Sequence, residues 1–332
     1  MGFLDLNGGL GRRFGSIGMA IDSHYTDLQV SRSPQPKITG LTESDPHYAK
    51  LLQIQSDFFV SLGRHIPASN QTLSIKIHQL IPEHAGLGSG TQLALSLGQA
   101  LCQLYGIIAT AEEIAQALGR GKRSGIGITS FEQGGFIIDA GIDSRSTSMP
   151  LTLMRLPFPP DWTVVLILDN SKQGVHGAVE RSAFNELPTF PRHAAETICH
   201  RTLMQLVPAL LTNNLENFSE AVTEIQRLIG SHFAPAQGGQ YASTDVAKLL
   251  DYAQSLGFKG LAQSSWGPSG CVFTANPKAA QTLIRQLTDY LAGHSGKSNH
   301  LSLLAAQCDT SGAVTSTSQH NTDIAKLNSD TH

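Results

Sequence analysis

The sequence lacks the features that mark disulfide-rich, membrane-spanning and histidine-metal proteins. Its four cysteines, Cys102, Cys199, Cys271 and Cys308, form no C-x-x-C pair, so we expect reduced thiols in a cytoplasmic protein. No apolar run approaches the ~20 residues that span a bilayer, and no cleavable signal is visible. The 13 histidines form neither an H-E-x-x-H motif nor a compact His/Cys cluster, which disfavours a histidine-based metal site.

Charge is also sparse. Charged residues make up 15% of the 332 residues and the net charge is −3, which gives no reason to expect nucleic acid or an anionic membrane as a partner. With 40% hydrophobic residues, the chain can bury a sizeable core, and its length suggests two domains. A composition shift near residues 150–160 predicts domains at 1–155 and 156–305. Residues 306–332 are rich in Ser, Thr, Asn and Asp, and we expect a disordered tail there.

The most informative segment lies between a predicted strand and a predicted helix. Apolar and polar residues alternate over 72–80, and 92–105 has helical periodicity. Between them lies the sequence Gly86-Leu87-Gly88-Ser89-Gly90-Thr91. A glycine-rich turn that opens a helix directs backbone N–H groups and the positive end of the helix dipole at one point, which favours phosphate. It is neither a Walker A loop nor a dinucleotide fingerprint. An ordinary strand-to-helix turn is the alternative.

Two further glycine-rich segments carry clustered cations. The first, residues 5–18, is a predicted hairpin that contains Arg12 and Arg13. The second, residues 119–127, contains Arg120, Lys122 and Arg123. Guanidinium donors are planar and match phosphate and carboxylate oxygens, so we predict that both segments bind anions. A solvated surface turn is the alternative for the first.

Periodicity and capping residues predict the remaining elements. We expect strands over residues 19–30, 128–131, 135–140, 162–168, 260–263 and 271–274. We expect helices over residues 48–63, 193–211, 215–229, 244–256 and 277–291. A T-x-x-E capping box at Thr110 opens another helix, which stops at Gly119.

Three segments resemble motifs of the GHMP kinase superfamily. Pro82 to Gln92 resembles its P-x-x-x-G-L-G-S-S-A-A loop, although Ser89-Gly90-Thr91-Gln92 replaces the last four residues. The first motif, G-x-x-D-x-x-G-G, is carried by Gly2, Asp5, Gly8 and Gly9. Residues 260–273 resemble the third motif, a glycine/serine loop that closes on the phosphates.

The combined pattern of residues 4–16, 82–92, 119–127 and 263–268 looks like the β-ribofuranosylaminobenzene 5′-phosphate synthase family of this superfamily. The resemblance covers roughly residues 1–305. It implies an α+β, two-domain fold, with a ribosomal-S5-like N-terminal domain and a ferredoxin-like C-terminal domain. It also implies a homodimer that joins phosphoribosyl diphosphate to 4-aminobenzoate or 4-hydroxybenzoate. Carbon dioxide and diphosphate are released, in tetrahydromethanopterin biosynthesis, without a redox cofactor.

The resemblance implies roles for particular residues. Residues 86–91 would cradle the diphosphate or the 5′-phosphate, and Ser265 lies in the loop that closes on the phosphates. Charge on the leaving group would be stabilised by Arg120, Lys122 and Arg123. The aromatic carboxylate would be oriented by Arg12 or Arg13. Asp5 would stabilise the ribosyl carbon or orient a cation, and a turn-capping Asp is an equal alternative. Magnesium would be held through Ser89, with the hydroxyl of Thr91 as the alternative.

Three departures from the superfamily pattern bear on function. Gly90 replaces a serine whose hydroxyl often helps to hold magnesium in the kinases. Gly127 stands where many of them have a catalytic Asp, which weakens the reading as an ATP-dependent small-molecule kinase. The family normally has a strand before the first motif, so we expect the first strand of the N-terminal domain to be missing ahead of Gly2. The remaining alternative is a non-catalytic ligand-binding relative, which clustered cations disfavour.

Overall fold

The computed structural model describes residues 1–146, 148–171, 187–264, 267–294 and 300–317. Its described strands form three sheets. The first has the order β3 (Asp27–Arg32), β5 (Leu73–Gln79) and β4 (Lys37–Thr39). The central sheet has the order β1 (Gly2–Asp5), β2 (Arg12–Met19), β6 (Phe136–Asp139) and β8 (Thr152–Leu156), with β7 (Ile142–Asp143) also paired to β2. The third has the order β10 (Leu261–Gln263), β11 (Gly270–Thr274), β9 (Thr163–Asp169) and β12 (Leu301–Ala306).

The N-terminal half packs helices against the first sheet. Its helices are α1 (Pro46–Val60), α2 (Ser89–Tyr105), α3 (Ala111–Ala117) and a short 3-10 turn at Ala68–Asn70. The predicted alternation in β5 is confirmed, because Leu73, Ile75 and Ile77 are buried and Lys76 is exposed. The predicted capping box at Thr110 is also present, with Glu113 as its partner.

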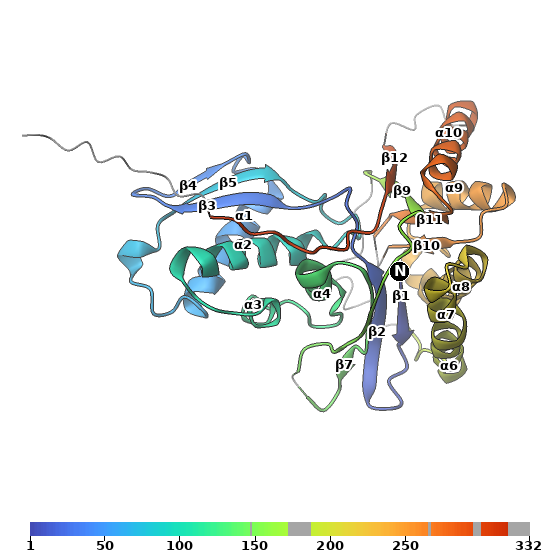
Figure 1. Ribbon diagram of the computed structural model, residues 1–332, viewed down its shortest axis with the longest axis horizontal. Helices are drawn as coiled ribbons and strands as arrows, with labels where there is room; N and C mark the ends of the chain where they lie inside the picture. The colour runs from blue at the N-terminus through green and yellow to red at the C-terminus, as the bar shows by residue number, and fades with distance from the viewer. Residues whose placement is uncertain (147, 172–186, 265–266, 295–299, 318–332) are drawn as a thin grey trace, which may run out of the picture.

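The C-terminal half is a sheet with helices on both faces, at the right of Figure 1. All seven residues of β9 are buried. Val165 and Ile167 pack with α9 (Thr244–Ser255) and α10 (Pro277–His294), whereas Val164 and Leu166 face a core that includes α8 (Leu215–Gln237). A strand buried on both faces reads as a continuous apolar run, as predicted from the sequence.

The helix predicted over residues 193–211 is interrupted. It consists of α6 (Arg192–Arg201), a π-helical turn at Thr202–Leu206 and α7 (Val207–Leu211). Pro208 has no N–H group to donate to the preceding turn, which accounts for a local change of helical pitch there.

Two strand predictions were wrong. Residues 128–131 belong to a helix, α4 (Ile126–Gln133), which contacts α2, α3 and the central sheet. Tertiary packing has overridden the β-propensity of Ile128, Thr129 and Phe131 in this short segment. The strand expected over 19–30 is two strands, because β2 ends at Met19 and β3 begins at Asp27. The residues between them leave the sheets and border a cavity.

The prediction of a disordered tail from residue 306 is wrong for residues 306–317, which make defined contacts with both halves of the protein. The segment 309–317 crosses from β12 to the N-terminal half, as the dark red trace in Figure 1 shows. The Gly135 N–H donates to Asp309 O, Ala313 N–H donates to Phe131 O, and Gln103 donates to Thr317 Oγ1. Backbone hydrogen bonds, rather than apolar side chains, hold this polar segment. Residues 318–332 of the predicted tail lie outside the described residues.

One hydrophobic core joins the two predicted domains. It combines Ile17, Phe136 and Ile138 of the central sheet with Phe158 and Phe218 from beyond the predicted boundary at residue 155. β1 is the edge strand of that sheet and pairs with β2 in antiparallel register. Across the described residues, the model contains no helix with the length and hydropathy of a membrane span.

Candidate active site

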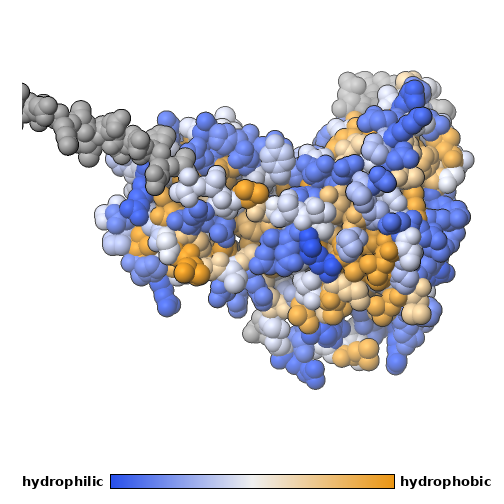
Figure 2. Space-filling view, viewed as in Figure 1, coloured by the Kyte–Doolittle hydropathy of each residue, from blue (hydrophilic) through white to orange (hydrophobic). Residues whose placement is uncertain are grey.

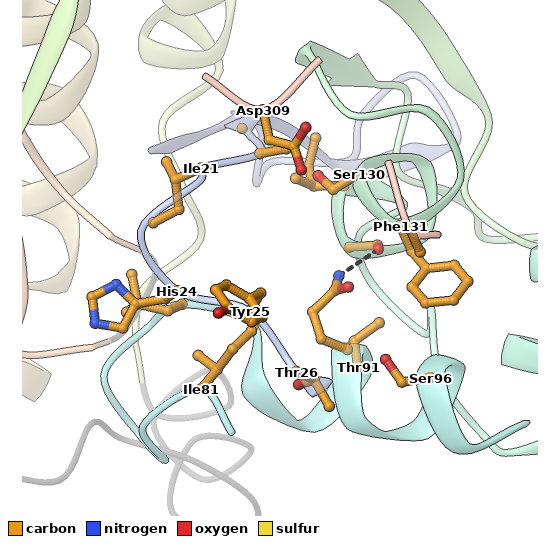
Figure 3. A pocket seen from close by; sticks show the side chains of 18 of the residues that line it. Ile21, His24, Tyr25, Thr26, Ile81, Thr91, Ser96, Ser130, Phe131 and Asp309 are labelled. Atoms are coloured by element: carbon orange, nitrogen blue, oxygen red, sulfur yellow. Dashed lines mark hydrogen bonds between the residues drawn. The ribbon is translucent and has the colours of Figure 1, made fainter. Parts of the chain in front are cut away.

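A cavity of about 1560 Å³ lies between the two halves of the molecule. The space-filling outline dips between these halves (Figure 2). Figure 3 shows part of the lining: Ile21, His24 and Tyr25 come from the segment between β2 and β3. Thr91 and Ser96 come from α2, and Ser130 and Phe131 from α4. The cavity is therefore built by segments that are far apart in the sequence.

The predicted phosphate-binding segment, residues 86–91, forms part of one wall of this cavity. We call it the phosphate loop. Gly88 is the N-cap of α2 and has a φ of +76°, a left-handed conformation that glycine adopts without strain. Gly86 meets the C-terminal half, because Ser264 Oγ donates to its carbonyl oxygen at 2.7 Å. A Cβ atom at Gly86 would overlap the Ser264 carbonyl oxygen. The glycine/serine loop therefore closes on the phosphate loop, although Ser265 itself lies outside the described residues.

The first turns of α2 and α4 meet at this wall. Gln92 Nε2 donates to Gly127 O at 2.8 Å. A Cβ atom at Gly127 would lie only 2.9 Å from Thr91 Cγ2, which is closer than real Cβ atoms approach. Thr91 and Gln92 thus occupy the space beside Gly127, where many kinases of the superfamily carry a carboxylate.

The second predicted anion-binding segment, residues 119–127, borders the same cavity. We call its residues 119–123 the cationic loop. The cavity lining includes Arg120, Lys122 and Arg123, together with Gly86, Leu87, Gly88 and Thr91 of the phosphate loop. The Nε atom of Arg120 is buried and has no hydrogen-bond partner among the residues that the structure describes. Its Nη1 atom lies 3.6 Å from the position of a Cβ atom at Gly90, so the guanidinium sits beside the first turn of α2. Burial lowers the pKa of Arg120, which is the signature of a cation held out of water.

Ser89 and Gly90 lie on the first turn of α2 but are not part of the cavity lining. Ser89 was the first of the two predicted magnesium ligands, and Thr91 was the alternative. The hydroxyl of the loop that does line the cavity is that of Thr91. Over the described ranges, no group of three or more His, Cys, Asp or Glu side chains could hold a metal ion. The residues present therefore do not form a dedicated metal cage.

The hairpin arginines do not line the cavity, so their predicted role in orienting the aromatic acid is corrected. Arg12 donates to the carbonyl oxygens of Ala140 and Gly141 at 3.0 and 2.9 Å. The Arg13 Nε atom donates to Leu6 O at 3.1 Å. Both guanidinium groups bind backbone carbonyls of the central sheet and its turns instead of a cavity ligand.

Asp5 also lies outside the cavity lining. Its Oδ1 atom accepts from the N–H groups of Asn7 and Gly8 at 2.7 and 2.9 Å. The turn-capping alternative is therefore the one that the structure shows.

A polar network fixes the residues just before the phosphate loop. Glu83 Oε1 lies 2.6 Å from Lys50 Nζ and 3.3 Å from His47 Nε2, and His47 Nδ1 lies 2.8 Å from Asp45. Lys50 and His47 belong to α1, so this network ties α1 to the start of the loop. Low exposure of Glu83 and His47, at 12% and 14%, strengthens such contacts relative to surface ion pairs.

Among the lining residues that sequence reasoning missed, His24 and Tyr25 carry acid–base groups. His24 and Tyr25 lie in the segment that was predicted to be a strand. His24 Nδ1 lies 3.0 Å from Ser23 Oγ, and burial lowers the pKa of its imidazole. A neutral imidazole at the cavity could accept a proton. No motif surrounds this histidine, so no signal in the sequence distinguished it from the others.

Known proteins share these sequences and this fold. Residues 53–135 match the family described as GHMP kinases N terminal domain, and residues 206–293 match GHMP kinases C terminal. L. major mevalonate kinase, crystallised with R-mevalonate, has the same fold: the TM-score is 0.64 at 14% identity, over 93% of this chain and 96% of that one. This likeness establishes the predicted fold class.

Curated sequence relatives are more specific. The β-ribofuranosylphenol 5′-phosphate synthase of Methanothermobacter thermautotrophicus is 31% identical over 80% of this chain and 83% of its own length. The protein of the same name from Archaeoglobus fulgidus is 31% identical over 87% of this chain and 88% of its own length. The chain therefore belongs to the β-ribofuranosylphenol 5′-phosphate synthase family of the GHMP kinase superfamily.

Proposed function

We propose that this protein condenses phosphoribosyl diphosphate with 4-hydroxybenzoate, with release of carbon dioxide and diphosphate, in tetrahydromethanopterin biosynthesis. The names of the relatives specify a phenol product, and a phenol requires the hydroxy acid as acceptor. The observation that carries the proposal is that one cavity is lined both by residues 86–88 and 91 of the phosphate loop, together with the adjacent residue 92, and by the cations of residues 120–123. A substrate with phosphates at both ends needs two such anion sites.

The reaction balances without an oxidant or reductant. The bond between the ribose C1 and the diphosphate oxygen breaks, and its electron pair leaves with the diphosphate. A C–C bond forms between C1 and the ring carbon that bears the carboxylate. The bond to the carboxylate then breaks, its electron pair restores the aromatic ring, and carbon dioxide leaves. We therefore propose no redox cofactor.

We assign to Arg120, Lys122 and Arg123 the role of stabilising the leaving diphosphate, because all three line the cavity. Negative charge builds up on the diphosphate as C1 becomes oxocarbenium-like, and fixed cations stabilise charge best in a site that excludes water. Arg120 suits this role because its Nε atom is buried and has no protein partner. The N–H groups at the start of α2 add the positive end of a helix dipole.

We further propose that magnesium arrives bound to the substrate diphosphate. Magnesium is usually held by substrate phosphates with few protein ligands, and Thr91 supplies the loop hydroxyl at the cavity. The family resemblance also suggests a homodimer, which sedimentation of the purified protein would test.

The decisive experiment mixes the protein with phosphoribosyl diphosphate and carboxyl-labelled 4-hydroxybenzoate and measures released carbon dioxide. We expect release that depends on both substrates, and slower release from 4-aminobenzoate. No release from either acid would overturn the proposal.

A kinase activity is the main competing function, because the fold is shared with kinases. The contact between Thr91 and Gly127 leaves no room for a catalytic carboxylate at residue 127. We therefore expect no ADP when the protein is incubated with ATP and small alcohols such as mevalonate or homoserine. Steady ADP formation would favour the kinase instead. A protein that binds phosphoribosyl diphosphate without turnover would point to the non-catalytic alternative.

A further inference from the structure

The carboxylate of Asp139 is completely buried at the end of β6 and is not part of the cavity lining. Its Oδ1 atom accepts from the N–H groups of Ser16 and Gly141, at 3.1 and 2.7 Å. Its Oδ2 atom accepts from Ser124 Oγ and the Gly125 N–H, at 3.0 and 2.9 Å. A buried charge is unfavourable unless hydrogen bonds satisfy it, and here four donors do so.

Two of these donors belong to the segment that joins the cationic loop to α4. Ser124 follows Arg123 directly, and its Oγ atom also accepts from the Ile126 N–H at 3.2 Å. Asp139 thereby holds the end of the cationic loop and the start of α4 together. The other two donors belong to β2 and to the turn after β6, so this junction is tied to the central sheet.

The start of α4 is in turn held against the phosphate loop. The Ile126 side chain packs over Gly18 of β2, where a Cβ atom would overlap it. Gly127 lies against Thr91, and its carbonyl oxygen accepts from Gln92. A continuous set of contacts therefore runs from Asp139 through residues 124–127 to the first turn of α2.

We infer that Asp139 is a positioning residue that fixes the distance between the cationic loop and the phosphate loop. This inference rests on the proposed function, because it explains how the two anion sites of one substrate keep their separation. Asp139 acts only through its neighbours and does not touch the substrate. It differs from a general packing residue because two of its four hydrogen bonds go to the junction between the cationic loop and α4, and the start of α4 contacts the phosphate loop.

The variant Asp139→Asn tests this role. The amide has the same shape, but its NH₂ group cannot accept a hydrogen bond, so one pair of donors loses its acceptor. Asp169→Asn is a matched control. Asp169 is a buried carboxylate of β9 that accepts from Ser171 and Ser243, and it is not part of the cavity lining.

Calorimetric titration of the full chain with inorganic diphosphate gives the first readout. We expect Asp139→Asn to bind diphosphate about tenfold or more weakly, and Asp169→Asn to bind it within about twofold of the parent. Urea unfolding of both variants shows whether their losses of stability are similar. If Asp139→Asn does not fold, Ser124→Ala removes a single bond of the network and should weaken diphosphate binding to a smaller extent.

Steady-state kinetics give the second readout. We expect Asp139→Asn to raise the KM for phosphoribosyl diphosphate, while the KM for the aromatic acid stays within about twofold. Equal effects of Asp139→Asn and Asp169→Asn, or unchanged diphosphate binding in Asp139→Asn and Ser124→Ala, would overturn the inference. These results are separable from the proposed function: a parent protein that releases no carbon dioxide refutes that function, while the diphosphate titration still tests Asp139.

Discussion

Thr91 and Gly127 form a complementary pair at the junction of α2 and α4. The methyl group of Thr91 lies 2.9 Å from where a Cβ atom at Gly127 would stand. A larger residue on one side therefore requires the smallest residue on the other. Thr91 stands where the superfamily motif has alanine and Gly127 where many of the kinases have aspartate, so two departures from the superfamily pattern lie in contact in this chain.

The pair predicts a coupled stability change. Gly127→Ala should destabilise the protein by about 1–3 kcal/mol, because the added methyl group overpacks the junction. Thr91→Ser removes the Cγ2 methyl group, so the double variant Thr91→Ser/Gly127→Ala should recover most of the loss. Urea unfolding of all four proteins measures the coupling. Strictly additive changes would show that the two residues do not interact as described.

Arg120 provides a second prediction. Arg120→Gln should lower kcat/KM for the synthase reaction about a hundredfold or more, because a buried cation opposite the leaving group is lost. Arg13→Gln is the matched control, since Arg13 is exposed and binds a backbone carbonyl outside the cavity lining. It should change the rate less than about threefold. Equal losses in the two variants would argue against the role given to Arg120.

His24 should make stability depend on pH. Burial lowers its pKa in the folded state, so the unfolded chain binds a proton at a higher pH than the folded chain does. The contribution of the neutral imidazole is present above the ordinary histidine pKa of about 6.5 and is lost as the pH falls below it. Between pH 7.5 and 5.5, the Tm should therefore fall more in the parent than in His24→Gln. Parallel decreases would contradict this assignment.

The thiols should react slowly in the folded protein. Burial raises the pKa of Cys102 and Cys271 to about 11 and that of Cys308 to about 12. Because the thiolate is the reactive form, only about one thiol in a thousand is ionised at pH 8 for a pKa of about 11. Iodoacetamide should label these cysteines much faster in urea than in buffer, as peptide mass spectrometry would show. Similar rates in both solvents would mean that the thiols are accessible.

Local sequence patterns predicted the helices, strands and loops whose defining residues lie close together in the chain. The phosphate loop is an example, because β5, the glycines and α2 are consecutive in the chain. Residues 128–131 are the opposite case. Their sequence, Ile-Thr-Ser-Phe, is too short to distinguish a strand from a helix, and the packing of α4 against α2 and α3 decides between them.

The candidate site was harder to predict because its contacts are distant in sequence. Nothing near Arg12 indicates that its guanidinium meets the carbonyl oxygens of Ala140 and Gly141. No local pattern in the sequence marks Asp139, because its four hydrogen-bond donors come from three separate segments of the chain. The cationic loop was found because its charges are consecutive, and the structure places it beside the cavity.

The segment 309–317 follows every other wall of the cavity in chain order. During synthesis on the ribosome, the phosphate loop emerges long before this segment can cover it. The N-terminal half has its own core, around Ile75 and Leu93, built from residues that precede this segment in the chain. A ligand that binds the completed cavity stabilises the folded state in which the late segment pairs with Phe131 and Gly135.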